Sequence, residues 1–161
     1  MKIKTLIVGC LVTLSLQLNA QKKYYYNETK EFTLVLPGDI YYEANKYDGV
    51  LSSETLFNDD LEADLTVWEG RDYNYLPTFS EELTLIANDY GYKEVREFTK
   101  GSMSNVIKYE FYIAYSPDDE CNVIFGIIQD SYSRKLYEFE LFCYNLTLSV
   151  ATAIINSIQI N

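Results

Sequence analysis

Apolar and polar residues alternate along several short segments of the chain, which is the pattern of strands with one buried face. The alternation is clearest over 106–115, where Ile107, Tyr109 and Phe111 are separated by Lys108 and Glu110. Similar or continuously apolar stretches are 32–36, 40–45, 51–58, 63–68, 92–99, 121–129 and 136–144. These segments predict an antiparallel β-sheet of about six to seven strands.

Two segments instead repeat apolar residues at every third or fourth position, the spacing of one helix face. The first spans 78–90, where Thr78 or Ser80 is suited to cap the N-terminus and Gly91 to end the helix. The second begins near Thr147 and continues toward the C-terminus. The sequence therefore predicts an α+β domain with two main helices beside the sheet.

The first twenty residues have the composition of a secretory signal peptide. Lys2 and Lys4 precede an apolar stretch over 6–18, and Ala20 offers a small residue for cleavage. About 13 apolar residues fall short of the roughly 20 that span a bilayer, so a membrane anchor is the less favoured reading. We expect an exported protein, periplasmic or extracellular, with no membrane span after cleavage.

A second processing route stays open, because residues 7–10 resemble the lipobox of bacterial lipoproteins. Cleavage before Cys10 would leave a lipid-anchored chain, and we rank this below cleavage after Ala20. The favoured route leaves a polar, tyrosine-rich, flexible lead-in over 21–30. A single globular domain over 31–161 follows it.

The charge and composition exclude several classes of function. The chain has no histidine, which removes imidazole from catalysis and from metal binding. Its formal charge is -11, and loss of the two signal lysines makes it -13, which argues against a nucleic-acid partner. No motif for a cofactor or metal stands out.

The two cysteines outside the signal peptide suggest one disulfide, since exported proteins form them readily. If the strands over 121–129 and 136–144 pair about Tyr132, Val123 faces Leu141 and Cys121 faces Cys143. We therefore predict a Cys121–Cys143 disulfide. Two buried free thiols are the alternative.

The densest acidic run lies over 58–64. Asp60, Glu62 and Asp64 at alternate positions suggest a Ca²⁺ loop, but Leu65 stands where such a loop needs glycine. A solvated turn between two strands is the favoured interpretation. Carboxylate pairs could also serve an acid-dependent hydrolase, although nothing distinguishes any one pair. An enzyme is accordingly the least supported reading.

The chain has 16 Tyr, 8 Phe and 1 Trp, more aromatic residues than a core of this size requires. Trp68 falls on the opposite strand face from Leu65 and Val67, and Tyr73 and Tyr75 follow in the next loop. Exposed aromatics of this kind serve protein interfaces and sugar-stacking platforms. Alternatively, a helix covers that face and buries Trp68.

The layout resembles the PsbP-like proteins, which include the extrinsic photosystem II subunit, a Ran-GTPase-binding relative and DcrB-type bacterial envelope proteins. The resemblance rests on an opening strand that ends in Leu36-Pro37, a central helix, a meander of long strands and the closing segment 153–160. It implies an α/β/α sandwich. It implies no catalytic residue, and members mostly bind or assist other proteins.

Two functions follow from these observations. The favoured one is a non-enzymatic protein-binding or assembly module of the bacterial cell envelope, whose partner would be an unknown envelope protein. The alternative is a small-ligand or carbohydrate-binding domain that uses Trp68, Tyr73 and Tyr75. The sequence leaves the oligomeric state open.

Overall fold

The computed structural model describes residues 21–26, 31–46, 50–69 and 78–161, with 21–26 and Glu69 described by their backbone alone. The predicted signal peptide lies outside these residues. In the parts described, no helix is both long and apolar enough to cross a membrane.

Seven of the described strands form one sheet in which every neighbouring pair is antiparallel. In spatial order they are β3 (Tyr41–Asn45), β4 (Ser52–Phe57), β5 (Leu61–Glu69), β9 (Lys135–Cys143), β8 (Cys121–Asp130), β7 (Ile107–Ser116) and β6 (Lys93–Ser102). Strand β7 runs through the segment whose alternation is clearest in the sequence. The predicted antiparallel sheet is confirmed.

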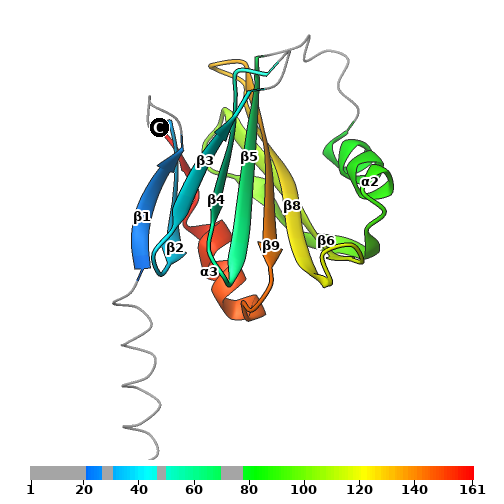
Figure 1. The fold of residues 1–161 in the computed structure, drawn as a ribbon. Coiled ribbons are helices and arrows are strands. Elements are labelled where there is room, and N and C mark those ends of the chain that lie inside the picture. Colours follow the sequence, from blue (N-terminus) through cyan, green and yellow to red (C-terminus); the bar gives the residue numbers. More distant parts are fainter. Residues whose placement is uncertain (1–20, 27–30, 47–49, 70–77) are drawn as a thin grey trace, which may run out of the picture.

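One face of the sheet is covered by a small sheet and a helix, drawn to the left of and below the large sheet in Figure 1. The small sheet has the order β1 (Gln21–Tyr26), β2 (Phe32–Pro37) and β10 (Gln159–Ile160). Helix α3 (Leu148–Asn156) begins at Thr147, whose hydroxyl accepts a hydrogen bond from the Val150 N–H. The main core fills the space between these elements and the sheet.

The opposite face is covered by helix α2 (Phe79–Asp89), drawn to the right in Figure 1. Thr78 and Glu81 form a capping box at its start, and Gly91 has a positive φ of 69° just beyond its end. Leu83 and Ala87 are buried against Val123, Phe125 and Ile127 in a second core. Helices on both faces confirm the predicted α+β sandwich.

The predicted disulfide is wrong, because the β8–β9 register differs by one residue from the expected one. Leu141 lies opposite Ile124 rather than Val123, and Cys143 opposite Asn122. A one-residue shift turns side chains to the other face of a sheet. Cys143 belongs to the main core, whereas strand alternation places Cys121 on the α2 face, and both are buried free thiols.

The turn between β8 and β9 explains the shift. Asp130 pairs with Lys135, so the turn contains four residues, an even number that cannot centre on Tyr132. The Asp130 carboxylate stabilises this turn with both of its oxygens. One accepts a hydrogen bond from the Tyr132 N–H at 2.9 Å, and the other accepts one from the Ser133 hydroxyl at 2.6 Å. Arg134 completes the turn with a φ of 56°.

The expected flexible lead-in is also corrected over its first part. Residues 21–26 form β1, which pairs with β2 from Gln21 opposite Pro37 to Tyr26 opposite Phe32. The pairing satisfies backbone groups along one edge of β2, while β10 occupies the other edge at Thr33 and Phe32. Residues 27–30 lie outside the description.

Candidate functional site

Strand alternation gathers four carboxylates on the sheet face that α2 covers. Glu62 and Asp64 come from β5, and Glu138 and Glu140 from β9. Asp64 lies directly opposite Glu140, so the two side chains point the same way from neighbouring strands. We call these four residues the carboxylate row.

Glu140 is the most strongly perturbed member of the carboxylate row. Burial is the main cause, and together with the charges of Asp64 and Glu138 it raises the Glu140 pKa to about 7. The Tyr92 hydroxyl donates a hydrogen bond of 2.9 Å to Glu140 Oε1 and partly offsets that increase. Burial and the same carboxylate raise the pKa of Tyr92, so its hydroxyl stays a donor.

Burial also raises the pKa of the other three members of the carboxylate row. Burial raises the Asp64 pKa although a hydrogen bond from the Thr55 hydroxyl and the neighbouring Glu62 both lower it. Burial raises the Glu138 pKa even though the neighbouring Trp68 side chain lowers it. The row therefore holds protons at pH values where exposed carboxylates are ionised.

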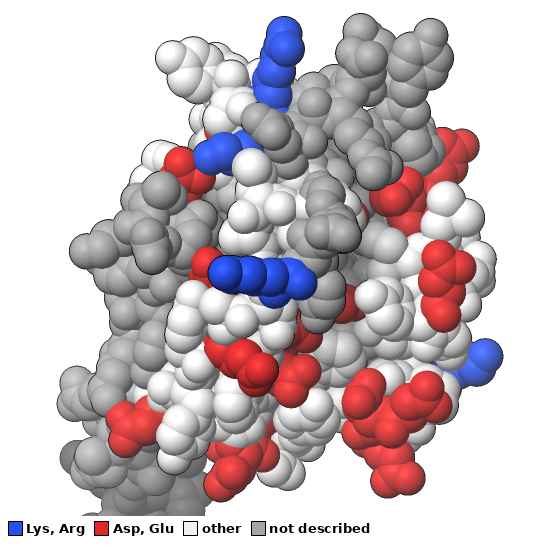
Figure 2. Space-filling model, turned by 45° about the horizontal axis from the view of Figure 1, so that its top comes forward, with Lys and Arg blue, Asp and Glu red and all other residues white. Residues whose placement is uncertain are grey.

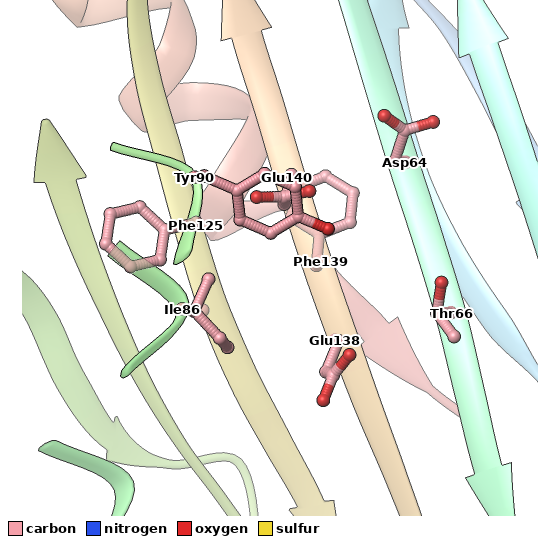
Figure 3. Close-up of a pocket in the computed structure, with 9 residues that line it drawn as sticks. Asp64, Thr66, Ile86, Tyr90, Phe125, Glu138, Phe139 and Glu140 are labelled. Atoms are coloured by element: carbon pink, nitrogen blue, oxygen red, sulfur yellow. The ribbon is translucent and has the colours of Figure 1, made fainter. Parts of the chain in front are cut away.

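A small pocket of about 70 Å³ opens onto the carboxylate row beside α2. Figure 3 shows Glu138, Glu140 and Asp64 on the sheet, with Ile86 and Tyr90 on the α2 side. This volume is far below the roughly 300 Å³ at which ligand pockets begin. Within the described ranges, no group of His, Cys, Asp and Glu is arranged to hold a metal ion.

Trp68 lies at the end of the face that carries the carboxylate row. It pairs with Leu136 across β5 and β9, is half-buried, and lies near enough to Glu138 to lower the pKa of that carboxyl. Tyr73 and Tyr75 fall within 70–77, outside the described residues. The aromatic binding surface of Trp68, Tyr73 and Tyr75 therefore stays a prediction.

The acidic run over 58–64 divides between a turn and a strand. Asn58 Oδ1 accepts from the Asp60 N–H at 2.9 Å and from the Leu61 N–H at 3.1 Å, which fixes a tight turn. Glu62 and Asp64 then belong to β5 and join the carboxylate row. The alternate spacing that suggested a Ca²⁺ loop reflects the two-residue period of a strand.

A second feature lies at the sheet edge formed by β3. Tyr41 is 69% exposed and Tyr42 56% exposed, and the Tyr41 ring lies 5.8 Å from that of Phe57. We call Tyr41 and Tyr42 the β3 tyrosine pair. The described surface is otherwise rich in acids, and Figure 2 shows Asp and Glu side chains gathered over the lower half of one face.

Comparison with known proteins identifies the fold. No protein-family model and no curated protein sequence matches the chain. Among solved structures, a mutant of the protein Mog1 matches with a TM-score of 0.53 and 9% sequence identity. The match covers 87% of this chain and 95% of that chain. At this identity the likeness shows a shared fold alone, and that fold agrees with the predicted α+β class.

The carboxylate row was not predicted from the sequence, although the alternation of its two β9 members with apolar residues is visible there. Glu138 and Glu140 alternate with Tyr137, Phe139 and Leu141. In isolation that alternation predicts a solvated outer face. Only the position of α2 over the same face shields these carboxylates and leaves them half-buried.

Proposed function

We propose that the protein is an exported, non-enzymatic binding module that docks another protein of the cell envelope. The observation that carries this proposal is the β3 tyrosine pair, whose two large aromatic side chains are both more than half exposed. Aromatic residues are enriched in protein interfaces, where they bury large areas at low entropic cost. Export is supported by the signal-peptide pattern of residues 1–20.

Among the residues that the structure describes, the pocket sizes support recognition by a surface rather than by a cavity. The pocket beside the carboxylate row measures about 70 Å³, and one between α3 and β7 about 130 Å³. Both are below the roughly 300 Å³ of small-ligand sites. The shared fold with Mog1 is compatible with this role, as is the PsbP-like resemblance, whose members mostly bind other proteins.

Site-specific photo-cross-linking in intact cells tests the proposal. A photoreactive phenylalanine derivative replaces Tyr42 in one strain, and Leu85, which is 54% exposed on α2, in a control strain. We expect one protein adduct from position 42 and none from position 85. Equal adducts from both positions, or none from either, would reject a docking surface at β3.

Two further measurements address export and the alternative ligand. Mass spectrometry of the purified protein is expected to find Gln21 as the first residue, whereas a lipidated Cys10 would show the other processing route. A glycan array is expected to give no signal. A specific glycan signal that disappears in Trp68→Ala would favour the carbohydrate-binding alternative.

A further inference from the structure

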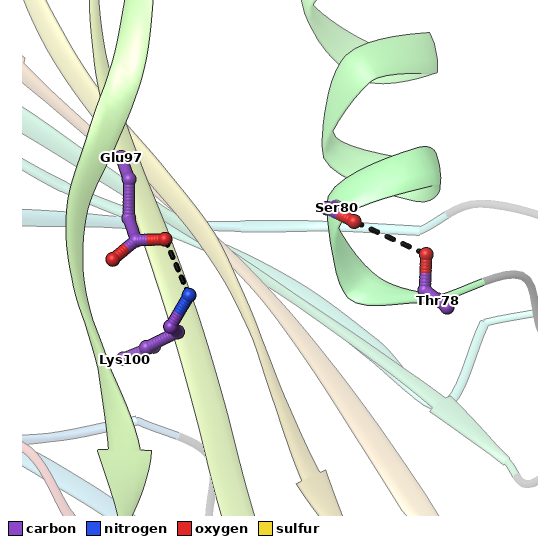
Figure 4. Close-up of polar contacts among 4 residues, drawn as sticks. All are labelled: Thr78, Ser80, Glu97 and Lys100. Carbon is purple, nitrogen blue, oxygen red and sulfur yellow. Dashed lines mark hydrogen bonds and ion pairs between the residues drawn. The ribbon is translucent and has the colours of Figure 1, made fainter.

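The seven-stranded sheet has two edges, β3 and β6, and they differ in protection. Strand β6 has register shifts between Lys93 and Arg96 and between Glu97 and Thr99. Its exposed Glu97 and Lys100 form an ion pair of 2.6 Å (Figure 4). Bulges and charges are devices that keep an edge strand from pairing with another chain.

Strand β3 has no bulge and only one charge. Its five residues pair with β4 in an unbroken register from Tyr41 opposite Phe57 to Asn45 opposite Ser53. Glu43 is its single charged residue, and it contains neither glycine nor proline. A regular, aromatic and nearly uncharged edge is the kind that accepts an added strand.

The hydrogen-bond alternation identifies which backbone groups of β3 face outward. The Asn58 N–H donates to the Leu61 carbonyl at 2.9 Å, so the even-numbered residues of β4 bond toward β5. The odd-numbered residues of β4, including Thr55, therefore bond toward β3. Their partners on β3 include Glu43, so the backbone of Ala44 points away from the sheet.

The charge of this region defines the partner. Near this edge Asp39, Glu43, Asp59 and Asp60 are exposed, against one exposed lysine, Lys46. Glu43 lies near enough to Glu62 for its charge to raise the Glu62 pKa. A second copy of this chain, with formal charge -11, would bring two acidic regions together. A cationic segment of another protein is complementary.

We propose that β3 is a strand-addition site that pairs, through the outward backbone of Ala44, with an extended Lys- or Arg-rich segment of a partner protein. The inference rests on the proposed function and specifies how the partner docks and what chemistry it presents. Main-chain hydrogen bonds would supply affinity. The exposed side chains of Tyr41 and Glu43 would give specificity by contacting the side chains of the added strand, where Glu43 favours Lys or Arg.

Two blocked seven-residue peptides and two variants test the site. One peptide alternates lysine with valine, and its counterpart alternates glutamate with valine. Ala44→Pro removes the outward N–H, and proline is tolerated at such edge positions. Ala44→Ser is the matched control because it keeps the N–H. Calorimetry at physiological ionic strength compares the affinities, and thermal unfolding checks that both variants fold.

We expect the lysine peptide to bind the unmodified protein and Ala44→Ser equally, and Ala44→Pro at least tenfold more weakly. The glutamate peptide is expected not to bind. Hydrogen exchange of the Ala44 amide in the unmodified protein gives an independent readout, and it should slow when the lysine peptide is added. That readout stands even if Ala44→Pro fails to fold.

Three results would overturn the inference: no binding of the lysine peptide, equal binding to Ala44→Pro and Ala44→Ser, or unchanged exchange at Ala44. The photo-cross-linking result separates this failure from that of the proposed function. If position 42 still cross-links a partner in the Ala44→Pro background, the module binds a protein by side chains and not by strand addition.

Discussion

The Tyr92 hydroxyl and the Glu140 carboxylate are joined by a hydrogen bond of 2.9 Å between the segment that follows α2 and strand β9. Tyr92 is buried, stacks on Tyr90 and contacts Phe125. It therefore ties the C-terminal end of α2 to the carboxylate row through one polar contact and two ring contacts.

Tyr92→Phe is expected to destabilise the protein by about 1.5–3 kcal/mol at pH 8, where Glu140 is ionised and loses a donor. Chemical denaturation measures the change. The loss of unfolding free energy should be smaller at pH 4, where Glu140 is protonated. Tyr132→Phe, at an 87% exposed turn position, is the control and should have no effect.

Glu140→Gln is expected to increase stability at pH 8 and leave it unchanged near pH 4. The pKa of Glu140 is raised in the fold to about 7 from 4.5, so the folded state binds more protons between these values. Its stabilising contribution is present below pH 4.5 and is lost as the pH rises to 7. The difference is on the order of 1–3 kcal/mol.

Unfolding free energies measured at intervals from pH 4 to pH 8 test this assignment. The unmodified protein should lose stability over that range more steeply than Glu140→Gln. Parallel profiles for the two proteins would show that Glu140 titrates normally and is not held protonated by its surroundings.

Gly126→Ala is expected to cost about 1–3 kcal/mol, the range for overpacking a core. A Cβ at position 126 would lie 2.1 Å from Phe111 Cδ1 and 2.7 Å from the Glu110 carbonyl oxygen. Gly101→Ala is the matched control, because its Cβ would meet the end of the Tyr109 side chain at 2.8 Å. Thermal unfolding should rank Gly126→Ala as the less stable variant.

Thiol titration of the denatured, unreduced protein without residues 1–20 is expected to find two reactive thiols, from Cys121 and Cys143. Burial raises the pKa of both, to about 12 for Cys143, so neither should react quickly in the folded protein. Titration without denaturant provides the comparison. If no reactive thiols are found after denaturation, the Cys121–Cys143 disulfide is present and its rejection is wrong.

The periodic elements of this fold could be predicted from the sequence, but one register could not. Strand β7 and helix α2 each bury a face with a clear period. Strand β8 instead reads Val-Ile-Phe-Gly-Ile-Ile over 123–128 and is buried on both faces. Apolar pairing then fits two registers equally well, and the four-residue turn held by Asp130 decides between them.

The candidate sites depend on contacts that are distant in the sequence. Glu140 is half-buried because α2, more than fifty residues earlier, covers its face, and no local pattern carries that information. The exposure of Tyr41 could be suspected from the surplus of aromatics. Its place on an edge strand required the order of the whole sheet.

The small sheet sets a condition on the timing of folding. Strand β2 pairs with β10 at Phe32 and Ile160, and the Asn161 N–H donates to the Glu31 carbonyl at 2.8 Å. A chain that emerges from a ribosome or a translocation channel N-terminus first therefore presents β2 long before this partner exists. The small sheet closes only when Gln159 and Ile160 have emerged, so one of the first strands waits for the last strand of the domain.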